Sequence, residues 1–325
     1  MAGSRHPVSG VSVAVALLPA AVAVSLAAAP LPAQTSARTL KVGSVERSYL
    51  LHLPPHLPRD GSAALILAFH GRGGDGAGME RLTRFSDLAD RDGFAVAYPD
   101  GLDRSWNDGR SVPAPGARRS DADDVGFILL LIDSLTAELH PDPRRIFATG
   151  FSNGAGFSHY LAARLSMRIA AIASVSGGIS DGAARHFPPM DPVSVLIIQG
   201  TADPLVPYAG GPVSGGRLGR ELGADSTALL WEESDGIRAA AATGELADVA
   251  PGDRCRVHWQ RWSGGRRGTE IRLYRLEGGG HTWPGGPQYL PRDIVGPVCR
   301  DFNATAAIWD FFAGHAKAPP RVESP

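Results

Sequence analysis

The stretch RIFATGFSNGAGFSHYLAARL, residues 145–165, decides the fold that we predict for this chain. It begins with an apolar run, residues 145–149, which predicts a short buried strand. The pattern G-x-S-x-G follows at residues 150–154, and a helical pattern at residues 153–165 comes directly after it. Strand, tight turn and helix in this order hold a serine at a strained turn with its hydroxyl exposed. Ser152 is therefore the candidate nucleophile.

The two glycines of this pattern have a steric role. We expect a Cβ atom at Gly150 or Gly154 to collide with neighbouring backbone. The start of the helix also favours negative charge that develops near the serine hydroxyl. The pattern by itself is weak, and an ordinary glycine-rich turn is the alternative, so its position between a strand and a helix carries the prediction.

Short apolar strands alternate with helices along the rest of the chain. This order predicts an α/β fold, with a mostly parallel central sheet flanked by helices and a ligand site at the carboxyl ends of the strands. Residues 210–250 are rich in Gly and Ala with weak periodicity, and we interpret them as an excursion near the active site. The expected strands are residues 47–54, 64–69, 94–98, 145–149, 170–175, 193–199 and 270–276. The expected helices are residues 78–92, 123–139, 153–165 and 304–314.

The composition fits a folded protein that does not bind nucleic acid. Of 325 residues, 43% are apolar and 20% are charged, so the chain can build a core. The 32 Lys and Arg residues balance 33 Asp and Glu residues, for a net charge of −1, and no basic run is present. That balance argues against a partner with a phosphate backbone. The length fits one large domain or two small ones.

Residues 1–33 have the layout of a secretory signal peptide. Arg5 is the one full charge among them, an apolar run covers residues 11–29, and small residues precede Gln34. A retained membrane anchor is the alternative, but weak hydrophobicity and Pro19 count against it. We therefore expect a secreted protein without membrane association after cleavage, and one catalytic domain over residues 34–325.

The small number of cysteines argues against a disulfide-rich scaffold and against a zinc site. Cys255 and Cys299 are the two cysteines of the chain, too few for a disulfide scaffold or a zinc site. We expect no metal and no cofactor. In an oxidising compartment the two cysteines are candidates for a disulfide, and two buried free thiols are the alternative.

A glycine-rich loop, HGRGG at residues 70–74, follows the predicted strand 64–69. Such a loop can supply one backbone N–H to an oxyanion hole, and the residue after the nucleophile supplies the other. Those donors would be Arg72 and Asn153. A phosphate-binding loop is the alternative, but its G-x-x-x-x-G-K-[ST] pattern is absent. We interpret His70 as a hydrogen-bonded loop residue rather than a catalyst.

Two later loops supply a candidate acid and a candidate base. QGTADP, residues 199–204, ends a strand and carries Asp203, and GGGHTW, residues 278–283, follows the last strand and carries His281. The chain order Ser, Asp, His is that of α/β-hydrolases and differs from the orders in chymotrypsin and subtilisin. Ser152, Asp203 and His281 are therefore the predicted catalytic residues.

At this point the sequence resembles the secreted polyhydroxybutyrate depolymerase and feruloyl esterase group of α/β-hydrolases. The resemblance covers roughly residues 40–315 and implies the α/β-hydrolase fold with the same three catalytic residues. It also implies that Trp106, Asn107 and Trp283 border the acyl site. Arg72 is a departure, since relatives often carry an uncharged residue there. The matching motifs are HGRGG (70–74), YPDG (98–101), SWN (105–107), DDVGF (123–127), GFSNG (150–154), GTADP (200–204) and GHTWPGG (280–286).

The expected function is that of a secreted serine carboxylesterase, which hydrolyses small-molecule or oligomeric esters through an acyl-enzyme. Tyr208 also lies on a loop near the predicted chemistry and is a further candidate for substrate contact. An extracellular depolymerase for hydroxyalkanoate polyester or oligomers is one alternative. A non-catalytic binding protein of the same fold is another, although the intact Ser, Asp and His disfavour it. The oligomeric state stays open.

Overall fold

The chain is described here by a computed structural model that covers residues 1–3, 34–111 and 123–318. The predicted signal peptide, residues 1–33, lies almost entirely outside the described residues. The described residues from 34 onward belong to one compact unit, which holds the sheet, its helices and the site. Within the described residues, no helix has both the length and the apolar character needed to cross a membrane.

A ten-stranded sheet forms the centre of the protein, in the order β1-β2-β4-β3-β5-β6-β7-β12-β11-β10. Its six middle strands run parallel, which confirms the predicted mostly parallel sheet, and its edge strands are antiparallel, which the sequence pattern does not predict. The parallel strands are β4 (Ala95–Pro99), β3 (Leu65–Phe69), β5 (Ile146–Phe151), β6 (Ala171–Val175), β7 (Ser194–Gly200) and β12 (Ile271–Glu277). The antiparallel strands are β1 (Gln34–Val42), β2 (Val45–Leu53), β11 (Arg256–Trp262) and β10 (Ala242–Glu245).

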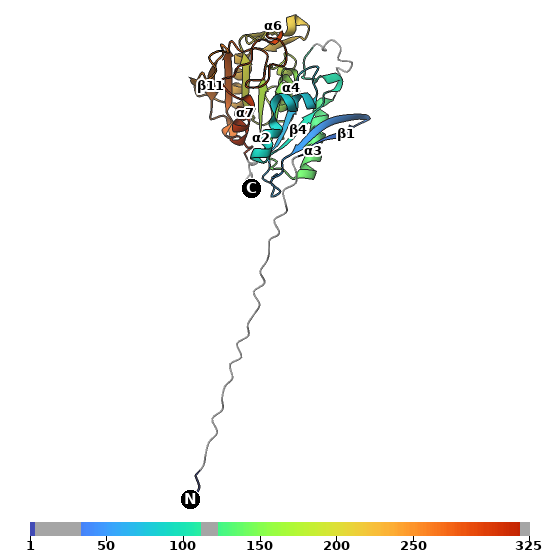
Figure 1. The fold of residues 1–325 in the computed structure, drawn as a ribbon, viewed down its shortest axis with the longest axis vertical. Coiled ribbons are helices and arrows are strands. Elements are labelled where there is room, and N and C mark those ends of the chain that lie inside the picture. The colour runs from blue at the N-terminus through green and yellow to red at the C-terminus, as the bar shows by residue number, and fades with distance from the viewer. Residues whose placement is uncertain (4–33, 112–122, 319–325) are drawn as a thin grey trace. The chain divides into compact units, whose positions relative to one another are not determined.

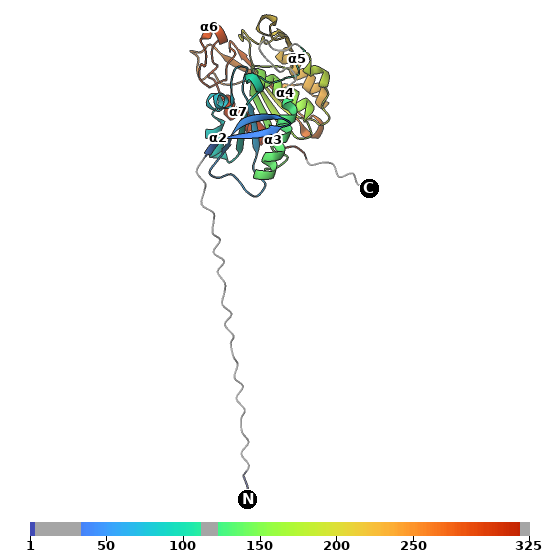
Figure 2. The ribbon, with the colours of Figure 1, turned by 90° about the vertical axis from the view of Figure 1, so that its right-hand side faces the viewer.

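Helices cover both faces of this sheet and bury one apolar core on each side. One core takes its helical residues from α3, α4 and α5, which lie together on the right in Figure 2. The other takes them from α1, α2 and α7, two of which are labelled in Figure 1. The helices are α1 (Gly76–Thr83), α2 (Phe85–Asp92), α3 (Asp124–Leu139), α4 (Asn153–Arg164), α5 (Ala224–Asp235), α6 (Arg292–Val295) and α7 (Ala304–Ala313). Single 3₁₀ turns lie at Leu102–Arg104, Ala183–His186, Val213–Gly216 and Arg266–Gly268.

The predicted helix over residues 78–92 is two helices in the structure. Arg84 has the left-handed angles φ 54° and ψ 32°, so it ends α1 and starts α2 in a new direction. Its N–H still bonds to the carbonyl of Glu80 at 2.8 Å. The break lets Phe85 enter the core with no exposed surface. Periodicity does not reveal it, because both halves keep an apolar face.

The interpretation of residues 210–250 as one excursion needs correction. A small hairpin, β8 (Gly210–Pro212) with β9 (Arg220–Leu222), does lie beside the site described below. Helix α5, however, packs into the core through Trp231, and β10 adds an edge strand to the main sheet. The periodicity of α5 is weak because Leu229 is 51% exposed next to the buried Ala228.

The start of α4 lies against the end of β3 with no room for a side chain. An ideal Cβ on Gly154 would lie 2.3 Å from the carbonyl oxygen of Phe69 and 2.6 Å from that of His70. A Cβ on Gly150 would lie 2.1 Å from the carbonyl oxygen of Gly154. The expected steric role of both glycines is therefore confirmed, since backbone atoms at these distances cannot move aside easily.

We predict that Gly154→Ala lowers the free energy of unfolding by about 2–4 kcal/mol, because the new methyl group must displace the carbonyl groups of Phe69 and His70. Urea denaturation measures the change. Gly252→Ala is the matched control, since a Cβ there meets nothing within 4 Å. Equal small effects of the two substitutions would contradict the steric argument.

Candidate active site

Ser152 occupies the turn between β5 and α4, with the strained angles φ 56° and ψ −119°. Non-glycine residues rarely adopt a positive φ, so surrounding structure must hold the turn in place. One such contact is the hydrogen bond that the Ser152 N–H donates to the carbonyl of Val175, at 2.9 Å, at the end of β6. The hydroxyl makes no capping bond to α4. The predicted strained strand-to-helix turn is confirmed.

His281 and Asp203 meet at the carboxyl ends of β12 and β7. Nδ1 of His281 lies 2.7 Å from Oδ2 of Asp203, and both side chains are buried. The other carboxylate oxygen of Asp203 accepts hydrogen bonds from the N–H groups of Leu205 and Val206, each at 2.8 Å. These bonds fix the carboxylate, and the carboxylate in turn fixes the imidazole.

One cavity of about 910 Å³ contains both Ser152 and His281 in its wall. The predicted nucleophile and base therefore line the same cavity, and the predicted acid, Asp203, is hydrogen-bonded to His281. The size lies within the range of sites that enclose a small organic ligand. Its position at the carboxyl ends of the parallel strands is the one expected for this fold. The apolar part of its wall consists of Met79, Leu82, Phe151, Leu205, Val206, Val213, Leu218, Pro287, Tyr289 and Leu290.

The two predicted oxyanion donors lie next to Ser152. Arg72 and Asn153 line a small side pocket of about 30 Å³ that also includes Ser152. Asn153 is the first residue of α4, and the N–H groups of a first helical turn have no partner within the helix. The loop that carries Arg72 is held by the bond from the Gly73 N–H to the carbonyl of Arg104, at 2.7 Å.

The side chain of Asn153 faces the protein and holds a neighbouring loop. Its Oδ1 accepts from the N–H of Trp106 at 2.8 Å and from the hydroxyl of Ser105 at 3.2 Å. Its Nδ2 donates to the carbonyl of Trp106 at 3.1 Å and to Oδ2 of Asp108 at 2.9 Å. Hydrogen bonds of its side chain thus connect Asn153, the residue after the nucleophile, to the loop of residues 105–108.

His70 serves as a structural link between two loops. Its Nε2 accepts from the N–H of Gly101 at 2.9 Å, and its Nδ1 lies 2.7 Å from the carbonyl of Gly71. Nδ1 must therefore carry the proton of a neutral ring. Burial lowers the pKa of His70, which also favours the neutral form. This geometry agrees with the interpretation of His70 as a hydrogen-bonded loop residue.

The two tryptophans expected at the acyl site are buried in the protein. Trp106 is 3% exposed and stacks on Phe157, and its indole N–H donates to the carbonyl of His70 at 3.0 Å. Trp283 is 1% exposed and donates to Oγ1 of Thr305 at 3.0 Å. Among the described residues that line the large cavity, neither appears. Their placement supports the loops rather than contact with a substrate.

Tyr208 and Asn107 are likewise not among the described residues that line the large cavity. The Tyr208 hydroxyl donates to Oδ1 of Asp225 at 2.8 Å. The Asn107 N–H donates to Oδ2 of Asp124, at 2.7 Å, and Asp124 pairs with Arg47 at 2.7 Å. Both residues therefore fasten loops to helices.

Two aromatic residues that the sequence interpretation missed do line the cavity. The rings of Phe151 and Tyr289 meet edge to face with centroids 5.6 Å apart, and the ring of Phe151 lies 5.0 Å from that of His281. Phe151 could have been found, since it precedes the nucleophile in the G-x-S-x-G pattern. Tyr289 follows no pattern in the sequence.

A buried charged group lies beside the small pocket. Arg110 pairs with Asp108 and lies 3.5 Å from Oε1 of Glu221 on β9. Burial raises the pKa of Glu221 to about 7, although the positive charge of Arg110 opposes the shift. The negative charges of Asp108 and Asp203 act in the same direction as burial.

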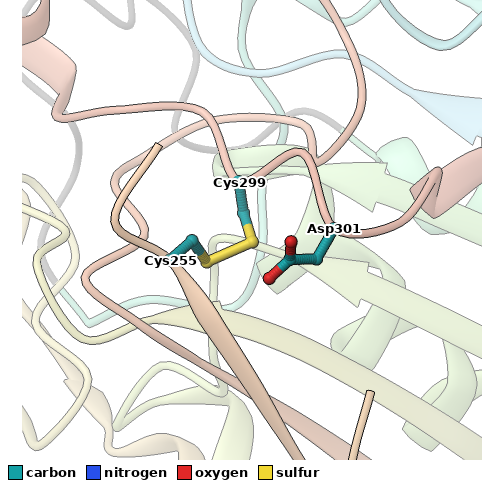
Figure 3. A group of neighbouring side chains, drawn as sticks. All are labelled: Cys255, Cys299 and Asp301. Atoms are coloured by element: carbon teal, nitrogen blue, oxygen red, sulfur yellow. A yellow bond between two sulfur atoms is a disulfide. The ribbon is translucent and has the colours of Figure 1, made fainter. Parts of the chain in front are cut away.

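The predicted disulfide is present and joins Cys255 to Cys299 across 44 residues, with Cα atoms 5.4 Å apart. Figure 3 shows it next to Asp301. These three residues form a group of metal-ligand types, but the two sulfur atoms are bonded to each other. Since metals bind cysteine as a free thiolate, the group is not suited to hold an ion.

The disulfide anchors the segment that holds the loop of His281. In that segment, the carbonyl of Val295 accepts a hydrogen bond from the His281 N–H at 2.5 Å. The carbonyl of Pro297 accepts one from the Gly280 N–H at 2.9 Å. The carbonyl of Cys299 itself accepts the N–H of Gly285 at 2.8 Å. The covalent link and these bonds together fix the backbone around the candidate base.

With this geometry in view, sequence comparison places the chain in a family. A family model described as "Esterase PHB depolymerase" matches residues 47–206, which include Ser152 and Asp203. "Putative esterase NocK" of Nocardia uniformis subsp. tsuyamanensis is 32% identical over 292 residues, 87% of this chain and 83% of NocK. This chain belongs to the esterase PHB depolymerase family.

Two further comparisons extend this result. Feruloyl esterase B of Piromyces equi is 30% identical over 246 residues, which are 73% of this chain but 42% of that relative, so the match spans less than half of its length. The acetyl xylan esterase from Aspergillus awamori is a solved structure with a TM-score of 0.54 and 16% identity, and the match covers 76% of this chain and 94% of that one. That likeness shows a shared fold, and the predicted α/β-hydrolase fold is confirmed.

The raised pKa of Glu221 leads to a prediction for stability. In the unfolded chain the Glu221 carboxyl has its ordinary pKa of 4.5, whereas in the folded protein its pKa is about 7. Between these two pH values the folded state therefore keeps a proton that the unfolded state has lost. Stability is therefore lost as the pH rises through this window. Glu221→Gln has no carboxyl to titrate, so it does not lose stability in this way. The difference in free energy of unfolding between the variant and wild type should therefore change in favour of the variant by roughly 2–3 kcal/mol from pH 5 to pH 8.

Denaturant unfolding at several pH values measures this difference. Glu46→Gln is the control, because Glu46 is an exposed carboxylate on β2 whose charge is screened by solvent. A stability difference between Glu221→Gln and wild type that does not change with pH would contradict the argument.

The disulfide leads to a second prediction. Reduction should loosen the His281 loop before the sheet melts, because the chain cross-link is worth roughly 4 kcal/mol and acts directly on the segment that carries the loop. We expect ester hydrolysis to fall several-fold at temperatures where the circular dichroism of the helices is unchanged. Full activity in reductant, with both thiols titrated as free, would refute this.

Proposed function

We propose that this protein is a serine esterase that hydrolyses carboxylic esters through an acyl-enzyme on Ser152. The observation that carries the proposal is the geometry of one cavity. A serine in a strained turn and a histidine held by a buried carboxylate share its wall. Membership of the esterase PHB depolymerase family supports the same reaction class.

In the proposed mechanism, Oγ of Ser152 attacks the ester carbonyl carbon while His281 removes the hydroxyl proton. His281 then donates this proton to the leaving alkoxide, and an acyl-serine remains. Asp203 holds the imidazole in one tautomer and stabilises its charged form. Backbone N–H groups of Asn153 and Arg72 bind the oxyanion. Water, activated by His281, releases the acid and restores Ser152.

The cavity wall favours uncharged esters with an aromatic acid part. Phe151 and Tyr289 offer ring surfaces for stacking beside the nucleophile. At the rim, Arg104 pairs with Asp75 at 2.9 Å, so part of the charge there is already balanced. The named relatives include a feruloyl esterase, which fits this preference. Hydroxyalkanoate oligomers are the second candidate, because about 910 Å³ exceeds what one short ester fills.

We also infer that the protein is exported. Residues 1–33 read as a signal peptide, and a disulfide persists mainly in an oxidising compartment, which supports the same location. Residues 34–325 would then form one catalytic domain.

We predict that Ser152→Ala abolishes turnover of p-nitrophenyl acetate, with a loss of at least about 1,000-fold, because no nucleophile remains. The variant should also lose labelling by a fluorophosphonate probe. Ser44→Ala, in the exposed turn between β1 and β2, is the control and should keep both. Turnover at the wild-type rate in Ser152→Ala would rule out the assignment. A wild-type protein that neither turns over esters nor takes the label would instead be a binding protein.

The same assay separates the substrate candidates. Methyl ferulate, p-nitrophenyl butyrate and hydroxybutyrate oligomers are compared by kcat/KM. The aromatic proposal expects methyl ferulate to be preferred. Preference for the oligomers would favour the second candidate.

A further inference from the structure

Asp108 is a buried carboxylate that the mechanism above does not use. Its side chain has no exposed surface, and it follows the SWN motif in the loop beneath the nucleophile. A charge in the interior is costly unless it is paired and hydrogen-bonded. Asp108 meets this condition through two partners, which are Nδ2 of Asn153 at 2.9 Å and the guanidinium of Arg110, with Nε at 2.7 Å.

Arg110 extends these contacts to the hairpin β8–β9. Its guanidinium also donates to the carbonyl of Leu218 at 2.6 Å and lies 3.5 Å from Oε1 of Glu221. The other oxygen of Glu221 accepts the N–H of Gly178 at 2.9 Å. A continuous polar chain thus runs from Asn153 through Asp108 and Arg110 to Glu221.

The backbone around Asp108 has no freedom to shift. Gly109 has φ 74°, and a Cβ there would meet the ring of Tyr160 at 2.8 Å. The carbonyl of Asp108 accepts the hydroxyl of Ser180 at 3.1 Å. A Cβ on Gly156 of α4 would lie 3.2 Å from the Asp108 carboxylate. The carboxylate is therefore a fixed point against which the side chain of Asn153 is held.

We propose that Asp108 is a positioning residue for the oxyanion hole. It holds the amide of Asn153, and this fixes the orientation of the peptide N–H that follows the strained Ser152. The guanidinium of Arg110, which also lies 3.5 Å from Glu221, balances the charge of Asp108, so that Asp108 is not an unpaired negative charge one hydrogen bond away from Asn153. The inference rests on the proposed function, since it assigns a role within the same site.

A merely structural role would lower stability and leave the chemical step intact. A positioning role predicts a different pattern, because the oxyanion forms in the transition state and not in the bound ester. Loss of Asp108 should therefore lower kcat and leave KM nearly unchanged. It should also weaken binding of a trifluoromethyl ketone, whose adduct with the serine carries an oxyanion.

The first test is Asp108→Asn, which keeps the shape of the side chain and removes its charge. We expect kcat to fall by about 10–100-fold with KM within about twofold, and the trifluoromethyl ketone to lose affinity by a similar factor to kcat/KM. Asp191→Asn is the matched control. Asp191 is another buried carboxylate, paired with Lys317 at 2.7 Å, but it lies at the amino end of β7, away from the site. It should lower stability with kcat unchanged.

The second test is a double-mutant cycle with Asn153→Ala, which keeps the peptide N–H and removes the amide that Asp108 holds. If Asp108 acts through that amide, the double variant should be no slower than the slower single variant. Effects on kcat that multiply would overturn the proposal, and so would an unchanged kcat in folded Asp108→Asn. If Asp108→Asn does not fold, Asn153→Ala decides alone, since unchanged kcat there removes the basis of the proposal.

Failure of this inference can be told apart from failure of the proposed function. If the wild-type protein hydrolyses esters and is labelled at Ser152, but Asp108→Asn matches it in kcat, the inference alone fails. If the wild-type protein does neither, the proposed function fails first.

Discussion

The contact between the start of α4 and the end of β3 is the constraint on which the rest of the site depends. Gly154 lies so close to the carbonyl oxygens of Phe69 and His70 that a methyl group cannot fit between them. This approach holds Ser152 at φ 56° and brings the loop of Arg72 beside it. Because the contact is made by backbone atoms, side-chain motion cannot relax it, and the candidate nucleophile and oxyanion donors keep their places.

Hydrogen bonds between loops stabilise this arrangement at the carboxyl end of the sheet. Asn153 holds the backbone of Trp106, His70 accepts the N–H of Gly101, and Asp124 accepts the N–H of Asn107. Each bond satisfies a polar group that would otherwise be costly to bury. Several of the motifs that carry the family resemblance are therefore hydrogen-bonded to one another. This explains why so many of their residues lie near the site without lining its cavity.

Local sequence patterns predicted the central strands and most helices because a buried strand or an amphipathic helix depends on residues close in sequence. They did not reveal the turn at Arg84, helix α5 with its exposed Leu229, or the edge strand β10. The candidate triad also followed from sequence, since each member ends a strand of a parallel sheet. The aromatic residues near the substrate did not, because a loop tryptophan has the same pattern whether it faces a cavity or the core.

The sequence by itself determined the parallel sheet, the strained serine turn with its two glycines, and the order of Ser152, Asp203 and His281. These depend on residue type and on spacing along the chain. Only the tertiary structure decided that Phe151 and Tyr289, rather than Trp106 and Trp283, line the cavity, and that Asp108 reaches Asn153 while Arg110 reaches Glu221. Those contacts join segments that are distant in sequence, and their partners are chosen by how the loops pack above the sheet.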